Sequence, residues 1–299
     1  MTGVPEFGVN LNSFPGFREP PAATVAFVRL AEQLGYHEIR VLDHVVGIAA
    51  ERHGGIARTP YTSRSQIREC FTLLAYLSAV TERIRLLTGV LALPQRQTVL
   101  VAKQAAEVDI LSGGRLTLGV GVGYNPVEFE AMGAPFGDRG AHFEEQIAVL
   151  RRLWTEEEVS FEGRWHRISD ASLAPLPVQR PIPVWIGLGR MIAPIPPEPV
   201  LRRVGRLADG WLPLFGPDEA GRGAVETVRR AALDAGRDPD AIVMEMVLDV
   251  AGKGPDRLAD DVARLRDFGA GRINLLLPGN SAADQTEAMK RFREVMDRF

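Results

Sequence analysis

Residues 84–123 read IRLLTGVLALPQRQTVLVAKQAAEVDILSGGRLTLGVGVG. The stretch begins with a nearly continuous apolar run, 84–93, which is typical of a strand that helices cover on both faces or that a barrel encloses. Residues 98–111 follow with helical spacing and stop at a Ser-Gly-Gly sequence. A second apolar run, 116–123, completes the pattern, which predicts two parallel strands joined by a crossover helix.

The same alternation of strand and helix extends to both ends of the chain. The strand candidates are 7–12, 38–45, 84–93, 116–123, 184–187, 210–214, 242–250 and 272–277. Eight units in 299 residues average about 37 residues each, enough for a strand with its crossover helix. The sequence therefore predicts an α/β fold, a (β/α)8 TIM barrel, in a single domain spanning residues 1–299.

A doubly wound open sheet is the alternative fold, because it uses the same alternation of elements. The turn after the first strand lacks the G-x-G-x-x-G fingerprint that such a fold uses for dinucleotides. The glycines at 119, 121 and 123 are spaced by two, and Tyr124 follows them. The count of eight units and the missing fingerprint favour the barrel.

One irregular segment interrupts the repeat. Residues 155–180 follow the helix expected at 141–154 and carry a hairpin pattern, with strands at 159–161 and 165–168 around a turn at 162–164. A proline-rich stretch completes the segment. We interpret it as an insertion after the fourth helix of the barrel.

Composition narrows the classes of partner. Hydrophobic residues make up 45% of the chain and charged residues 24%, and the net charge is −3, without the basic patch that nucleic-acid binding requires. No stretch approaches the length of a transmembrane helix, and the first residues lack the pattern of a secretion signal. The only cysteine, Cys70, cannot form an internal disulfide. We expect a cytoplasmic enzyme without nucleic-acid or membrane partners.

Reacting groups on a barrel of this kind come from the carboxyl ends of the strands. The second strand ends at Asp43 and His44. Imidazole exchanges protons near neutral pH, and Asp43 or a backbone carbonyl would orient it, so His44 is the candidate catalytic residue. The alternative roles are a structural histidine and, for Asp43, a salt bridge with an arginine.

Other chemistries lack the residues that they need. His44 is the only histidine at a strand end, so a protein-bound metal is not expected. Asp43 has no evident partner carboxylate for glycoside hydrolysis, and a G-x-S-x-G motif is absent. None of the three lysines lies at a strand end, which argues against a Schiff-base aldolase.

Three further segments are candidates for binding a cofactor. Gly187, Leu188 and Gly189, with Arg190 next, follow a strand and could offer backbone N–H groups and a guanidinium to a phosphate. Gly121 and Gly123 would let a flat ring approach the backbone, or would serve tight packing. The long loop 46–67 carries Arg52, His53, Arg58 and Arg64 and predicts either a solvated rim or an electropositive lip for an anionic cofactor tail.

The sequence resembles the luciferase-like monooxygenases and the deazaflavin (F420)-dependent oxidoreductases that share their barrel. The matching stretches lie in the same order over most of the chain. They are TERIRLLTGVLALP (81–94), AKQAAEVDILSGGRLTLGVGVG (102–123), EFEAMGAPFGDRG (128–140), 144–154, 159–163, PVWIG (183–187) and ADGWLP (208–213).

The resemblance implies a cofactor at the carboxyl end of the barrel. Its ring would rest on a bulge after the third strand, at Thr88, Gly89 and Val90, where a cis peptide between Gly89 and Val90 is expected. Asp43 and His44 match the pair beside the ring in F420 enzymes, and Tyr124 would border the ring and the substrate. The turn at 187–190 matches the phosphate loop of the family, although Leu188 replaces the second glycine usual there.

The resemblance also implies two chemistries. With coenzyme F420, a hydride would pass between the ring and a small organic substrate while His44 handles the matching proton. With FMN, the enzyme would be a monooxygenase. The arginine-bearing loop favours F420, a non-catalytic flavin-binding barrel remains a third hypothesis, and relatives commonly form homodimers.

Overall fold

A computed structural model of the protein describes residues 3–11, 20–49, 52–53, 61–189, 193–279 and 281–299. The chain forms two compact units whose segments alternate along the sequence. The first unit consists of Met1–Val41, Val80–Leu87 and Trp185–Phe299, and the second of Leu42–Ala79 and Thr88–Val184. The single domain over 1–299 stays a prediction.

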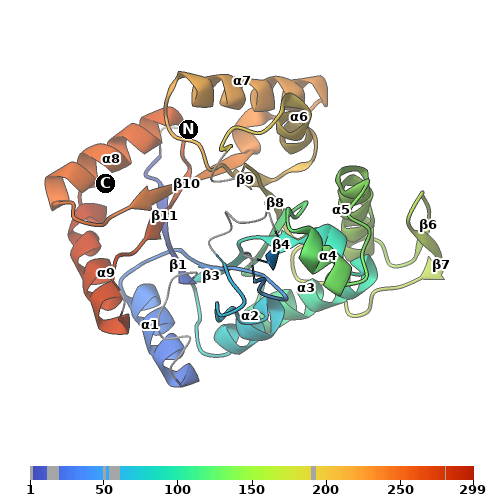
Figure 1. The fold of residues 1–299 in the computed structure, drawn as a ribbon, viewed down its shortest axis with the longest axis horizontal. Helices are drawn as coiled ribbons and strands as arrows, with labels where there is room; N and C mark the ends of the chain where they lie inside the picture. Colours follow the sequence, from blue (N-terminus) through green and yellow to red (C-terminus); the bar gives the residue numbers. More distant parts are fainter. Residues whose placement is uncertain (1–2, 12–19, 50–51, 54–60, 190–192, 280) are drawn as a thin grey trace. The chain divides into compact units, whose positions relative to one another are not determined.

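The first unit supplies most strands of the barrel. These strands are β1 (Glu6–Asn10), β2 (Glu38–Val41), β3 (Arg85–Thr88), β8 (Val184–Gly187), β9 (Gly210–Leu212), β10 (Val243–Asp249) and β11 (Arg272–Leu276). Its helices are α1 (Pro21–Gln33), α6 (Glu198–Leu207), α7 (Glu219–Asp234), the 3-10 turn η5 (Pro239–Ala241), α8 (Pro255–Phe268) and α9 (Ala282–Met296). Helix α6 packs against α7, and α8 against α9 (Figure 1).

The second unit is mostly helical. It contains α2 (Cys70–Ser78), β4 (Leu91–Ala92), the 3-10 turn η4 (Leu93–Gln95), α3 (Thr98–Ser112), β5 (Leu116–Gly121), α4 (Pro126–Ala131), α5 (Arg139–Thr155), β6 (Val159–Glu162) and β7 (Arg167–Ala171). Strands β6 and β7 pair antiparallel, which confirms the hairpin predicted in the insertion. The short helix α4 was not predicted, since the fourth helix was expected to begin only at residue 141.

The strands pair in the order β3-β2-β1-β11-β10-β9-β8-β5-β4, and β3 also pairs with β5. Neighbouring strands such as β1 and β2, or β10 and β11, run parallel. Each of the eight predicted strands is present, and the series closes, so the (β/α)8 barrel predicted from the sequence is confirmed. Figure 1 labels β1, β3, β4, β8, β9, β10 and β11 of this series.

The third predicted strand differs from the expectation. Residues 84–93 were expected to form one strand, but the structure has two short strands, β3 and β4, on either side of Gly89 and Val90. The peptide bond between these two residues is cis, as the resemblance implied. Thr88, the last residue of β3, is fully buried, and its hydroxyl donates to the carbonyl of Gly119 at 2.7 Å.

A cluster of buried charges lies on strands of the first unit. The Arg272 guanidinium donates to Glu38 at 2.6 Å and to Glu6 at 2.7 Å, and Arg40 donates to Glu245 at 2.8 Å. Burial raises the pKa of Glu38 well above its ordinary value, and the neighbouring Glu245 carboxylate raises it further, against the opposing effect of Arg272. We therefore expect Glu38 to hold a proton that it shares with Glu245.

Replacing Glu38 by Gln should stabilise the protein at alkaline pH. A carboxyl group whose pKa is raised in the folded state contributes its full stability below its unfolded pKa and loses it as the pH rises toward the folded pKa. A neutral amide avoids this loss while still accepting from Arg272 and donating to Glu245. We expect the midpoint of thermal unfolding of Glu38→Gln to exceed that of the wild type by about 2–4 °C at pH 8 and to match it near pH 4.

Glu6→Gln is the matched control, since Glu6 bonds the same guanidinium but its side chain is 42% exposed. Comparing it with Glu38→Gln separates the loss of a bond to Arg272 from the loss of a buried carboxyl group. A wild-type midpoint that exceeds that of Glu38→Gln most strongly at pH 8 would show that Glu38 is ionised there.

Candidate active site

His44 is held by a carboxylate from another part of the second unit. The residue follows the end of β2, and its Nδ1 lies 2.9 Å from Oε1 of Glu128, in the first turn of α4. The side chains of His44 and Glu128 are 12% and 3% exposed, respectively, so the contact is largely shielded from water. Glu128, and not Asp43 or a backbone carbonyl as expected from the sequence, is therefore the group that orients His44.

The start of α4 explains why Glu128 reaches His44. Asn125 caps the helix by accepting from the backbone N–H of Val127 at 3.1 Å, and Pro126 occupies the first turn. Phe129 is fully buried, and a Cβ on Gly123 would lie 2.8 Å from its ring, so these two residues pack the helix against the end of β5. The sequence Asn-Pro-Val-Glu was a usable signal for this helix start and for the acid in its first turn.

The contact with Glu128 decides which nitrogen of His44 can exchange protons. A carboxylate oxygen only accepts hydrogen bonds, so Nδ1 donates to it and Nε2 is the nitrogen left for proton exchange. This arrangement suits general acid–base catalysis.

Two tyrosine rings flank the imidazole. The His44 ring centroid lies 4.7 Å from that of Tyr61 and 6.1 Å from that of Tyr124. Tyr124 is 40% exposed, and the neighbouring Val45 and Val46 are 42% and 37% exposed. Exposed apolar and aromatic side chains around a shielded imidazole indicate a place where an apolar or flat molecule can bind.

Asp43 contacts other groups than His44 does. Its Oδ1 accepts from Nη2 of Arg96 at 2.8 Å, and Nη1 of Arg96 lies 3.6 Å from Glu69 at the N-cap of α2. This is the arginine salt bridge considered as the alternative role for Asp43. Burial raises the pKa of Asp43, while the charge of Arg96 and the contact with Cys70 oppose the rise.

Asp43, Glu69 and Cys70 could also be read as a set of metal ligands. Their ligand atoms lie within 4.8 Å of one another. The cation that faces the two carboxylates is the Arg96 guanidinium, however, and burial raises the pKa of the Cys70 thiol well above its usual range. The arrangement described here is therefore an ion pair beside a buried cysteine.

The predicted ring-binding residues of the second unit have defined places. Thr88 is buried, with its hydroxyl bound to a backbone carbonyl, and Gly89 and Val90 are half-buried at the cis peptide. Gly121 ends β5. Gly123 has a φ of +71° and no room for a side chain, which supports the packing role for this glycine.

The predicted phosphate turn belongs to the first unit. The N–H of Leu188 donates to the carbonyl of Leu212 at 3.3 Å, so this N–H is engaged within the sheet. Gly189 has a φ of +90°, and a Cβ there would collide with the carbonyl of Pro194. Gly187 ends β8, and Arg190 lies outside the described residues. A role for this turn in binding phosphate stays a prediction.

The arginine-bearing loop is described in part. Arg52, His53 and Arg64 are exposed, whereas Arg58 lies outside the described residues. The N–H of Ser63 donates to the carbonyl of Ile48 at 2.8 Å, which joins the two sides of the loop. Exposed cations in this loop are consistent with both the solvated rim and the electropositive lip.

Comparison with known proteins identifies the relatives of the chain. The family described as luciferase-like monooxygenase matches residues 6–298. A protein of Mycobacterium tuberculosis H37Rv named "Uncharacterized protein Rv0940c" is 35% identical over 251 residues, which cover 82% of this chain and 81% of that protein. The F420-dependent glucose-6-phosphate dehydrogenase of Intrasporangium calvum is 35% identical over 188 residues, 61% of this chain and 50% of that enzyme.

Solved structures share the fold at low sequence identity. The long-chain alkane monooxygenase LadA has a TM-score of 0.81 and 14% identity, covering 100% of this chain and 91% of that one. A riboflavin lyase solved with modified FMN and riboflavin has a TM-score of 0.69 and 14% identity, covering 89% of this chain and 67% of that one.

Among the helices that the structure describes, none has the length and apolar composition needed to cross a bilayer.

Removing Arg96 should destabilise the protein by leaving the Asp43 charge buried and unpaired. We expect Arg96→Met to lower the free energy of unfolding by about 3–5 kcal/mol at pH 8, the usual cost of breaking a buried ion pair from one side. The loss should be smaller at pH 5, because protonation of Asp43 removes the unpaired charge. Urea unfolding at the two pH values measures both effects.

The double variant Arg96→Met/Asp43→Asn is the control for this prediction. It carries no unpaired charge and should regain most of the lost stability at pH 8. A double variant as unstable as Arg96→Met would mean that Arg96 acts through packing and not through the charge of Asp43.

Proposed function

Because the chain belongs to the luciferase-like monooxygenase family, we propose that it is an oxidoreductase that transfers a hydride between coenzyme F420 and a small organic substrate. The family comprises oxidoreductases and monooxygenases, with F420-dependent and FMN-dependent members. The observation that carries the proposal is the His44–Glu128 pair, a shielded imidazole with one nitrogen bound and the other available.

The residues around His44 fit a flat redox cofactor. Tyr61 and Tyr124 offer aromatic surface beside the imidazole, and Val45 and Val46 add exposed apolar surface. These are the groups that bind a planar ring, and the imidazole supplies the polar contact that such a ring needs for orientation. When bound, F420 would supply hydride transfer at its ring carbon C5.

His44 would manage the proton that accompanies the hydride. Its Nε2 would give a proton to a substrate oxygen during reduction, or take one from a hydroxyl during oxidation. Glu128 would keep the imidazole in the tautomer that leaves Nε2 available.

The choice of F420 over FMN has two supports. F420 carries an acidic tail, and exposed Arg52 and Arg64 lie on the loop that follows His44. A relative 35% identical to this chain is named as F420-dependent. FMN-dependent monooxygenation is the second candidate, supported by the fold shared with an alkane monooxygenase and with a lyase solved with modified FMN.

The partners remain those expected from the sequence. We propose a small organic substrate that contacts Tyr124, Val45 and Val46. A homodimer in the cytoplasm, with no nucleic-acid or membrane partner, completes the proposal.

The cofactor can be identified by titrating the purified protein with F420 and with FMN and following fluorescence. We expect F420 to bind with a Kd in the micromolar range or below. Added salt should weaken binding, and Arg52→Ala and Arg64→Ala should each weaken it severalfold, because both remove charge facing an anion. Lys290→Ala, an exposed cation on α9, is the matched control. Binding of FMN alone would favour the second candidate.

His44 can be tested by separating turnover from cofactor binding. We expect His44→Ala to lower turnover with a panel of alcohols, carbonyls and alkenes by about 100-fold or more and to change cofactor affinity by less than about tenfold. Glu128→Gln should lower turnover less, because its amide oxygen still accepts from Nδ1. The exposed His37 is the matched control.

Unchanged turnover in His44→Ala would remove this residue from the mechanism. A wild-type protein that binds a cofactor but turns over no member of the panel would favour the non-catalytic barrel.

A further inference from the structure

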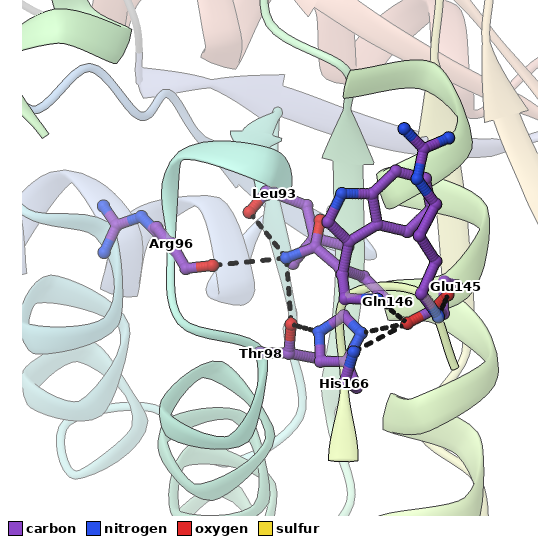
Figure 2. A network of polar contacts seen from close by, with 8 residues as sticks. Leu93, Arg96, Thr98, Glu145, Gln146 and His166 are labelled. Atoms are coloured by element: carbon purple, nitrogen blue, oxygen red, sulfur yellow. Dashed lines mark hydrogen bonds and ion pairs between the residues drawn. The ribbon is translucent and has the colours of Figure 1, made fainter. Parts of the chain in front are cut away.

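One buried amide joins the insertion to the candidate active site. Gln146 lies in the middle of α5 and is fully buried. Its Nε2 donates toward the carbonyl of Leu93 at 3.1 Å, the carbonyl of Arg96 at 3.2 Å and the hydroxyl of Thr98 at 3.0 Å (Figure 2). All three acceptors belong to the segment from η4 to the start of α3, so a single side chain fixes this turn.

The hydroxyl of Thr98 links Gln146 to the hairpin. It lies 2.6 Å from Nε2 of His166, in the turn between β6 and β7. Nδ1 of His166 lies 2.8 Å from a carboxylate oxygen of Glu145, which only accepts hydrogen bonds, so Nδ1 carries a proton. In the neutral ring, Nε2 then accepts from the Thr98 hydroxyl, whose oxygen in turn accepts from Gln146.

Glu145 holds the turn of the hairpin through its backbone. Its carboxylate accepts from the N–H groups of Arg164, Trp165 and His166 at 2.8, 2.9 and 2.9 Å (Figure 2). Although burial opposes it, these bonds and the one from His166 lower the pKa of Glu145. The carboxylate therefore stays charged and keeps its bonds over a wide pH range. The hairpin, α5 and the η4 turn form one polar network.

Arg96 is the point where this network meets the candidate active site. Its carbonyl faces Gln146, while its side chain extends away from Gln146 (Figure 2). The guanidinium ends 2.8 Å from Asp43, the residue before His44. The N–H of Arg96 also donates to the carbonyl of Leu93 at 3.0 Å, so the same turn fixes both ends of its main chain.

We propose that Gln146 is a positioning residue for the candidate active site. Its amide holds the turn at 93–96 so that the Arg96 guanidinium neutralises Asp43 and fixes the strand end that carries His44. The claim that Gln146 supports catalysis rests on the proposed function. The claim that Gln146 positions Arg96 beside the Asp43 carboxyl group does not depend on it.

A positioning role makes a prediction that simple packing does not. The charged and titratable groups around Asp43 are Arg96, Glu69, Cys70 and His44, and of these Arg96 opposes the effect of burial most strongly. If the turn relaxes, Arg96 retreats and burial dominates, so the pKa of Asp43 rises further. A residue that only fills space leaves this pKa unchanged.

The experiment measures the titration of Asp43 in the purified chain without cofactor. The carboxyl carbon of Asp43 is followed by 13C NMR and identified by its loss in Asp43→Asn. We expect Gln146→Met, which keeps the length of the side chain but has no N–H, to increase the proton affinity of Asp43 by about tenfold. Gln285→Met is the matched control, because Gln285 is equally buried but lies on α9 of the first unit.

A second pair of variants guards against a Gln146→Met protein that fails to fold. Thr98→Val keeps the shape of the side chain and removes the hydroxyl, whereas Thr98→Ser retains it. We expect Thr98→Val to shift the titration of Asp43 in the same direction by a smaller amount, and Thr98→Ser to match the wild type.

The outcomes separate this inference from the proposed function. An Asp43 titration that is the same in Gln146→Met, Thr98→Val and the wild type overturns the positioning role, whatever cofactor binds. Failure to bind F420 or FMN overturns the proposed function and leaves the Asp43 result intact. If both stand, the pH dependence of turnover should shift in Gln146→Met and not in Gln285→Met.

Discussion

The candidate site depends on the neutralisation of one buried carboxylate. Asp43 is 4% exposed, and a charge so far from water is tolerated only with a close partner. Arg96 is that partner, and it comes from the turn between β4 and α3. The N-terminus of α2 adds Glu69 on the other side of the guanidinium. The ion pair thus ties three segments of the second unit together at the point where β2 ends.

Asp43 and His44 show how adjacent residues can take different tasks. Both residues lie just beyond β2, where Asp43 meets Arg96 and His44 meets Glu128. The aspartate anchors the strand end, and the histidine keeps one nitrogen available. A largely buried imidazole is thereby placed next to an aspartate that is held by its own ion pair.

Local patterns in the sequence predicted much of the fold but only part of the site. The eight strands and the hairpin follow from apolar periodicity. The rule that chemistry gathers at strand ends makes Asp43 and His44 candidates, and their roles stay predictions. The family resemblance added the cis peptide after Thr88. Glu128 and Arg96 escaped prediction, because they lie 84 and 53 residues from their partners and no periodicity links them. Gln146 escaped for a related reason, since a buried amide within an amphipathic helix has no local signature.

The way in which Glu145 binds the hairpin has a consequence for sequence divergence. Its carboxylate recognises main-chain N–H groups, which every residue except proline provides. Arg164 and Trp165 can therefore be exchanged for many other residues while the attachment survives, whereas Gly163 cannot, because a Cβ there would lie 2.6 Å from the Glu145 carboxyl carbon. The tip of the insertion is thus free to diversify between homologues, and it offers protein engineers a place to graft new side chains.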